Sequence, residues 1–112
     1  MEQTRLNAYR IMWLFVYFDL PVVKKRDRKR AAKFRQFLLN DGFTMMQYSV
    51  YTRHCSSKQN AEMHIRIIED NIPEKGHVNI LTITDKQYGN IINFWGAESE
   101  PLEKAPQQLT FF

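Results

Sequence analysis

The longest apolar run in the chain covers Ile11 to Phe18 and consists mainly of aromatic and β-branched residues. The sequence Asp19-Leu20-Pro21 follows it and ends the apolar pattern. An uninterrupted apolar run of this length, closed by a turn signal, is typical of a strand that is buried on both faces. We therefore expect this strand at the centre of a sheet.

The spacing of apolar positions changes to a helical period over residues 26–40. Ala31, Phe34, Phe37 and Leu38 share one arc of a 3.6-residue helical wheel, and Gly42 stands where a glycine after a helix is common. The pattern predicts an amphipathic helix that packs this arc against the sheet.

Residues 43–53 are rich in strand-forming residues, and they are followed by a second helical pattern. The first of these segments forms either one bent strand or two short strands that meet near Gln47-Tyr48-Ser49, since no Gly or Asn marks a tight turn there. A capping box from Ser56 to Gln59 then starts a helix that ends at Pro73 and has Ala61, Ile65, Ile68 and Ile72 on one face. After this helix we expect a strand over residues 77–84 and a polar turn over residues 85–90. A short strand over residues 91–95, closed by Gly96, follows the turn.

This order of elements predicts an α+β fold, a ferredoxin-like βαββαβ two-layer sandwich with an additional C-terminal strand. The two helices cover one face of such a sheet, so we expect a homodimer in which two sheets stack through the other face. The domain organisation that we predict is an N-terminal extension over residues 1–10, the ferredoxin-like domain over residues 11–96, and a C-terminal tail over residues 97–112.

Positive charge is concentrated in one part of the chain. The whole sequence carries a net charge of +4, but half of its sixteen basic residues lie between residues 24 and 35, where Asp27 is the one acidic residue. That segment has a net charge of +7, and it predicts a surface that binds phosphates, although a solvated helix face gives the same pattern. The basic residues are Lys24, Lys25, Arg26, Arg28, Lys29, Arg30, Lys33 and Arg35, with Arg26, Lys29 and Lys33 on one flank of the apolar arc and Arg28 and Arg35 on the other.

Composition narrows the cellular setting. The single cysteine, Cys55, cannot form an internal disulfide, which favours a reducing compartment, and we expect the protein in the cytoplasm. The apolar run that begins at Ile11 is far shorter than the roughly 20 residues needed to span a bilayer, so no membrane partner is expected.

Asp19 is the main candidate for metal chemistry, because it is a carboxylate at the end of a buried strand and next to the basic segment. Magnesium usually takes one or two carboxylates together with water and phosphate oxygens, and two copies of Asp19 in a symmetric dimer could provide such a pair. The alternative is an ordinary turn residue. The histidines His54, His64 and His77 show no metal-ligand spacing; we place His64 on a helix surface, and we expect no metal role for any of them.

The aromatic residues suggest a second kind of nucleic-acid contact, base stacking on an exposed sheet. Most of them are explained more simply as core residues, including most of Trp13, Phe15, Tyr17, Phe34, Phe37 and Trp95. Tyr48 and Tyr51 are the expected exceptions.

Four segments taken together resemble one protein family. The segments WLFVYFDLP, KKRDRKRAAKFRQFLLNDGF, MMQYSVYTR and VNILTITDKQY are similar, in order and spacing, to the small CRISPR-associated Cas2 family, especially members from systems with a single large RNA-guided nuclease. The resemblance covers about residues 12–96. It implies a ferredoxin-like homodimer that sits between two dimers of the CRISPR integrase and holds double-stranded DNA for insertion into the CRISPR array.

The resemblance also implies roles for individual residues. Asp19 matches the family's proposed magnesium ligand at the dimer axis, Tyr48 and Ser49 match a segment near the same cleft, and the helix cations match basic positions suited to duplex phosphates. Position 51 holds Tyr where Phe is usual, and the first strand begins about ten residues late. Some members of the family are described as metal-dependent ribonucleases or deoxyribonucleases, so a nuclease with paired Asp19 residues is the alternative function, and a related endoribonuclease toxin is a third.

The C-terminal tail ends in apolar residues after a segment rich in Glu and Pro. We expect a flexible linker followed by a docking segment, Leu109, Phe111 and Phe112, that binds the integrase or another chain. A frayed end with incidental apolar residues is the alternative. Other adaptation proteins and the RNA-guided nuclease are further expected partners.

Overall fold

Strand β1 (Met12–Asp19) forms the centre of a four-stranded antiparallel sheet in the computed structural model, which describes residues 9–102. The strand order is β2-β3-β1-β4, and β1 pairs with β3 on one side and with β4 on the other. The central place predicted for the first strand is confirmed. The main elements are β1, α2 (Lys25–Asn40), β2 (Thr44–Gln47), β3 (Val50–Cys55), α3 (Lys58–Glu69) and β4 (His77–Thr84).

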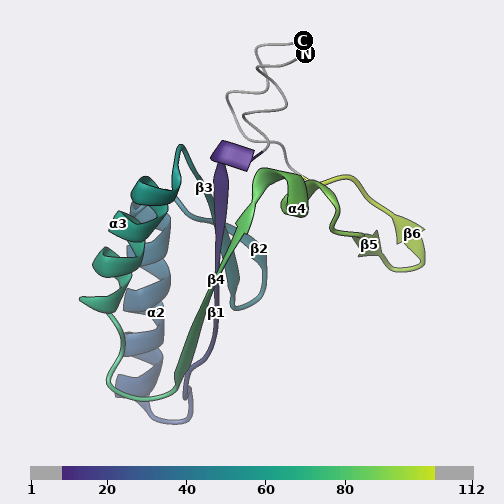
Figure 1. The fold of residues 1–112 in the computed structure, drawn as a ribbon. Helices are drawn as coiled ribbons and strands as arrows, with labels where there is room; N and C mark the ends of the chain where they lie inside the picture. Colours follow the sequence, from purple (N-terminus) through teal and green to yellow (C-terminus); the bar gives the residue numbers. More distant parts are fainter. Residues whose placement is uncertain (1–8, 103–112) are drawn as a thin grey trace.

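Helices α2 and α3 lie side by side on one face of the sheet, which gives the predicted ferredoxin-like two-layer arrangement (Figure 1). The core between the layers is formed by alternate residues of β1, Leu14, Val16 and Phe18, which pack against Phe34 and Leu38 of α2. Because successive side chains of a strand point to opposite faces, Trp13, Phe15, Tyr17 and Asp19 lie on the other face, away from the helices. We call this second face the outer face.

The outer face is covered at one end. A short helix, α4 (Asp85–Gly89), places Tyr88 against Trp13 with parallel rings whose centroids are 3.8 Å apart. The indole Nε1 of Trp13 donates a hydrogen bond to Asp85 Oδ1 at 2.6 Å. At the other end, Tyr17 is 43% exposed and Leu81 is 47% exposed within the described chain. The strand predicted to be buried on both faces is therefore half covered on its outer face.

The segment left open by the sequence forms two strands. Strands β2 and β3 pair as a hairpin with an irregular register between Met45 and Gln47. Ser49 takes the left-handed conformation, with φ of +64°, in place of the glycine or asparagine usual at such a turn. The turn between β2 and β3 thus depends on a left-handed backbone conformation at Ser49, which the usual turn preferences for glycine and asparagine do not indicate.

The predicted start and end of α3 and the structure predicted for residues 85–90 differ from those observed. Helix α3 is capped by Ser57, whose hydroxyl accepts a hydrogen bond from the backbone N–H of Asn60, and not by Ser56. It ends at Glu69, so Ile72 lies beyond the helix and is exposed. The segment expected as a polar turn forms α4, because Thr84 and Gln87 make a capping box that starts a helix there.

The C-terminal strand is shorter than predicted and does not join the main sheet. Among the described residues, strand β5 (Phe94–Trp95) pairs only with β6 (Glu98–Ser99). This small hairpin crosses the domain boundary expected at residue 96 and includes residues expected to form a linker. Trp95 is 78% exposed there, contrary to a core role. The reverse holds for Tyr51, which is buried because its position opposite Val16 places it on the helix-covered face.

Candidate nucleic-acid interface and strand-end acidic site

The basic segment covers α2 from its first residue, Lys25, to Arg35, together with Lys24 just before the helix, and most of its cations face solvent. The buried arc of α2 consists of Asp27, Ala31, Phe34 and Leu38, with Phe37 half-buried beside it, so the predicted arc is confirmed except that it also contains Asp27. Six of the eight cations are exposed, namely Lys24, Lys25, Arg26, Arg28, Lys29 and Lys33, while Arg30 and Arg35 are half-buried.

Two of the eight cations are engaged within the chain. Arg28 Nη1 donates hydrogen bonds to the carbonyl oxygens of Val22 at 3.0 Å and Val23 at 2.7 Å, and so fixes the loop before α2. Arg30 Nη2 lies 3.2 Å from Glu74 Oε2 in an ion pair. Within residues 9–102, no ion pair or side-chain hydrogen bond engages the five exposed residues Lys24, Lys25, Arg26, Lys29 and Lys33, which we call the α2 basic patch.

The single acidic residue of the segment does not weaken this patch at the surface. Asp27 is 7% exposed, and its Oδ1 has no hydrogen-bond partner among the described residues. Its place in the first turn of α2 is favourable because the helix dipole stabilises negative charge at the N-terminus. The charge on the solvent-facing side of this part of α2 is therefore positive.

A cavity of about 290 Å³ opens at the edge of the patch, between α2 and the loop after α3. Its lining includes Lys33 and Arg30 from α2, the ring of Phe37, and the carboxylates of Asp70 and Glu74. Because the lining mixes both signs of charge, the cavity is not a simple extension of the basic surface.

Asp19 lies at the exposed end of β1 on the outer face, at the end of the sheet away from α4. The turn between β2 and β3 lies beside it, since the backbone N–H of Phe18 donates a hydrogen bond to the carbonyl oxygen of Ser49 at 3.1 Å. Tyr48 in that turn is 77% exposed, so one of the two expected exposed tyrosines is confirmed. The structure thus brings the three candidates Asp19, Tyr48 and Ser49 to one end of the sheet.

The acidic site of one chain does not by itself fit magnesium. Among residues 9–102 there is no group of three or more His, Cys, Asp or Glu residues that could hold a metal ion. The residue directly opposite Asp19 in the sheet is His77, which offers a nitrogen ligand, whereas magnesium requires oxygen ligands in octahedral geometry. Sequence spacing could not indicate this pair, because strand register alone brings residues 19 and 77 together.

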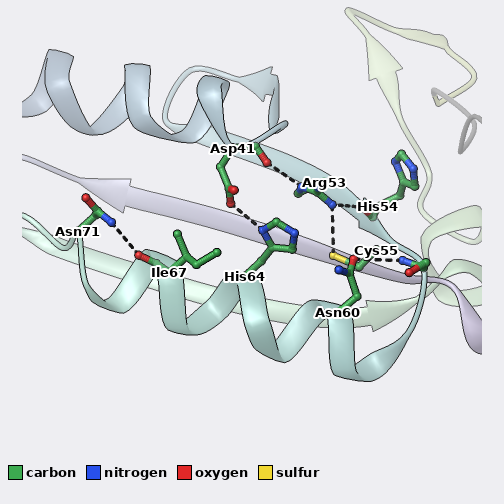
Figure 2. A network of polar contacts seen from close by, with 9 residues as sticks. Asp41, Arg53, His54, Cys55, Asn60, His64, Ile67 and Asn71 are labelled. Carbon is green, nitrogen blue, oxygen red and sulfur yellow. Dashed lines mark hydrogen bonds and ion pairs between the residues drawn. The ribbon is translucent and has the colours of Figure 1, made fainter.

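His64 is buried and not on the helix surface as predicted. Its Nδ1 lies 2.8 Å from Asp41 Oδ2, and this contact joins α3 to the end of α2 (Figure 2). Arg53 of β3 extends the network, since its Nε donates to the carbonyl oxygen of Asp41 at 2.8 Å. The network connects three elements of the core and lies on the helix-covered side of the sheet, so it is structural.

Cys55 belongs to the same network and is fully buried. Burial raises the pKa of the Cys55 thiol, and the nearby Arg53, whose Nη1 lies 3.9 Å from Sγ, partly opposes this effect. His54 contacts Trp13 on the outer face, so His54 and Cys55 point to opposite faces, as adjacent residues of a strand do. A buried thiol with a raised pKa is a poor nucleophile.

The structure leaves other expectations untested. Leu109, Phe111 and Phe112, proposed to dock on a partner, lie outside the described residues, as does most of the N-terminal extension. In the described part of the chain, no helix has the length and apolar character required to cross a membrane.

The family model and the relatives that match this chain all belong to one family. Residues 12–91 match the family model described as CRISPR associated protein Cas2. A protein of Flavobacterium psychrophilum named CRISPR-associated endoribonuclease Cas2 is 46% identical over 109 residues, which cover 97% of this chain and 95% of the relative. Proteins with the same name from Parvibaculum lavamentivorans and Paracidovorax avenae are 48% and 46% identical and cover 90% and 96% of this chain, and 100% and 99% of their own lengths.

Proposed function

Because the chain belongs to the Cas2 family of CRISPR-associated proteins, we propose that it is a DNA-binding scaffold for the acquisition of new spacers. In this proposal a homodimer holds double-stranded DNA through its phosphates and bridges dimers of the CRISPR integrase during insertion into the array. The proposed setting is the cytoplasm, where the array and foreign DNA meet.

The α2 basic patch is the observation that carries the proposal. Five exposed cations with no partner among the described residues are available to phosphates, and contacts from Lys and Arg to phosphates position a duplex without reading its sequence. A protein that must accept spacers of any sequence requires this kind of contact.

The uncovered part of the outer face supports the homodimer. Tyr17 and Leu81 are exposed there on two adjacent strands, and the pairing of Tyr17 with Asn79 and of Phe15 with Leu81 makes this surface continuous. Stacking of two such faces would bury these side chains, as aligned sheets do in sandwich folds. Two chains would then present the α2 basic patch twice to one duplex.

Spacer integration with the purified integrase tests the proposal. Reversal of Arg26, Lys29 and Lys33 to Glu is expected to abolish duplex binding and integration while the protein remains a folded dimer. Normal duplex binding by this variant would require another surface and would contradict the proposal.

Two observations favour a second function: the relatives are named as endoribonucleases, and Asp19 is exposed. It is a metal-dependent endonuclease that uses Asp19 from two chains, with Tyr48 and Ser49 beside it, and takes RNA or DNA as substrate; an endoribonuclease toxin would use the same residues. The substitution Asp19→Ala separates the classes. Integration that survives it favours the scaffold, and loss of metal binding together with integration favours the nuclease.

The proposed partners extend beyond DNA and the integrase to other adaptation proteins and the RNA-guided nuclease. Deletion of residues 109–112 tests the tail as the docking segment. Unchanged capture of the integrase by the shortened protein would exclude that role.

A further inference from the structure

The cavity between α2 and the loop after α3 has its two signs of charge on opposite sides. Its cations, Arg30 and Lys33, come from α2, whereas the carboxylates of Asp70 and Glu74 come from the loop. The ion pair of Arg30 with Glu74, at 3.2 Å, joins the two sides, and its charges offset each other. Lys33 and Asp70 are exposed and have no side-chain partner among residues 9–102, so each side keeps one charge for a ligand.

An aromatic ring forms a fixed part of the cavity wall. Phe37 follows Lys33 by one helical turn and is half-buried. Its ring is stacked on that of the buried Phe34, with centroids 6.1 Å apart and an interplanar angle of 24°. Ile72 and Pro73 add apolar surface from the loop. A flat ring that enters the cavity can therefore stack on an aromatic side chain that packing already holds in place.

Hydrogen bonds within the chain fix the loop side of the cavity. Asn71 lines the cavity, and its Nδ2 donates a hydrogen bond to the carbonyl oxygen of Ile67 at 2.9 Å (Figure 2). Its backbone N–H donates to the carbonyl oxygen of Ile68, also at 2.9 Å. The amide oxygen of Asn71 has no partner in the described part of the chain, so it remains an acceptor beside the carboxylate of Asp70.

The α2 basic patch leads along the helix to this cavity. Arg26, Lys29 and Lys33 follow one another at spacings of three and four residues, so they lie on one flank of α2. At 1.5 Å per residue they span about 10 Å along the helix axis, and Phe37 lies about 6 Å further on. A DNA strand whose phosphates contact these cations in turn is thereby brought to the cavity.

A ligand that fits this arrangement carries a negative charge, a flat ring and N–H donors on that ring. We propose that the cavity binds one unpaired nucleotide at the end of a DNA strand that follows the α2 basic patch. Lys33 contacts the phosphate of this nucleotide, and Phe37 stacks on its base. Asp70 and Asn71 accept hydrogen bonds from the amino group of the base. The proposal rests on DNA binding by the α2 basic patch, to which Lys33 belongs.

The experiment uses duplexes that differ in one unpaired nucleotide and carry the same number of phosphates. The overhanging nucleotide is adenine, a purine without the amino group, or an abasic sugar, in one set at the 3′ end and in another at the 5′ end. Fluorescence anisotropy measures their binding to the full chain. In at least one set we expect the adenine overhang to bind at least about fivefold more tightly than the abasic one. The purine without the amino group should bind about two- to tenfold more weakly than adenine.

Two substitutions separate stacking from hydrogen bonding. Phe37→Leu keeps apolar volume but removes the ring, and is expected to abolish the preference for adenine over the abasic sugar. Asp70→Ala is expected to reduce the preference for adenine over the purine without the amino group, and to keep the preference over the abasic sugar. Leu39→Ala and Glu69→Ala are the matched controls, because both residues are exposed and lie outside the cavity lining. Circular dichroism checks that each variant is folded.

A second measurement needs no variant of uncertain stability. Deoxyadenosine monophosphate is titrated into wild-type protein that contains ¹³C-labelled phenylalanine. We expect a saturable upfield shift of the Phe37 ring signals in NMR spectra, because a stacked base shields the protons above it, and no such shift with deoxyribose 5-phosphate.

The outcomes distinguish this proposal from the function on which it rests. Equal binding of all three overhangs by the wild type, with salt-dependent duplex binding intact, would overturn the nucleotide site and leave the scaffold. Absence of duplex binding would overturn both. Loss of integrase capture in Phe37→Leu, with the preference for adenine unchanged, would make the cavity a protein-binding site and would also overturn the proposal.

Discussion

Replacement of Arg26, Lys29 and Lys33 by Gln removes three of the five cations of the α2 basic patch without introducing negative charge. Each phosphate neutralised by a protein cation releases counterions, so the logarithm of the affinity falls with the logarithm of the salt concentration by about 0.9 per contact. If each cation of the patch meets one phosphate, one chain gives a slope of about −4.5, and the triple variant gives about −1.8.

These slopes correspond to large differences in a binding assay. Between 50 and 200 mM salt, a slope of −4.5 lowers the affinity about 500-fold, and a slope of −1.8 lowers it about 12-fold. If both chains of a dimer contact the same duplex, each of these slopes doubles. Fluorescence anisotropy of a labelled duplex, titrated at four or five salt concentrations, measures both slopes.

A matched control removes the same charge elsewhere. Lys58, Arg66 and Lys86 are exposed and lie outside the patch, so their replacement by Gln is expected to change the slope by less than one unit. Equal slopes for the two triple variants would show that net charge, and not the patch, determines binding, and would refute the assignment of the duplex to α2.

Three further predictions concern stability. Leu38→Ala truncates a fully buried side chain of the core and is expected to lower the free energy of unfolding, measured by urea denaturation, by about 2–5 kcal/mol. A change below about 1 kcal/mol would contradict the buried position of Leu38. Ser49 has a φ of +64°, so Ser49→Val is expected to lower the free energy of unfolding by about 1–2 kcal/mol, whereas Ser49→Gly should change it by less than about 1 kcal/mol. Equal stability of the two variants in urea denaturation would argue against the left-handed turn. Burial raises the pKa of the Cys55 thiol, so the folded state keeps this proton at a pH where the unfolded state has lost it. The resulting contribution to stability is full below the ordinary thiol pKa of about 8.5 and is lost as the pH rises toward the folded-state pKa. Denaturation of the wild type and of Cys55→Ala at mildly acidic pH and at pH 10 checks this, and the stability difference between them should shrink at the higher pH.

The elements with strong periodicity could be predicted from the sequence. The apolar run before Asp19 and the arc of Ala31, Phe34 and Leu38 each fix which face of an element is buried, so the central strand, the basic helix and the two-layer fold follow from them. The concentration of positive charge on α2 is likewise visible in the sequence, because half of the basic residues lie between residues 24 and 35. Exposed cations require no partner elsewhere in the chain, so their exposure could be predicted without knowing the fold.

The parts that sequence reasoning missed depend on contacts between distant residues. His64 has the spacing of a helix residue at the edge of the apolar face, and it is buried because Asp41, at the end of another helix, provides a polar partner. The pairing of Asp19 with His77 depends on the register of two strands that are far apart in sequence. The turn at Ser49 uses a conformation that serine rarely adopts, so residue preferences could not locate it.

The central position of β1 has a consequence for how the protein is made. Trp13 pairs with Ile83, which follows it by seventy residues, so the strand synthesised first cannot complete its hydrogen bonds until almost all of the described domain has been translated. At translation rates of about 5–20 residues per second, this apolar strand waits roughly 4–14 s for its second neighbour. Completion of the sheet therefore depends on contacts of high sequence separation, and the apolar β1 segment lacks its β4 neighbour for longer than it lacks β3.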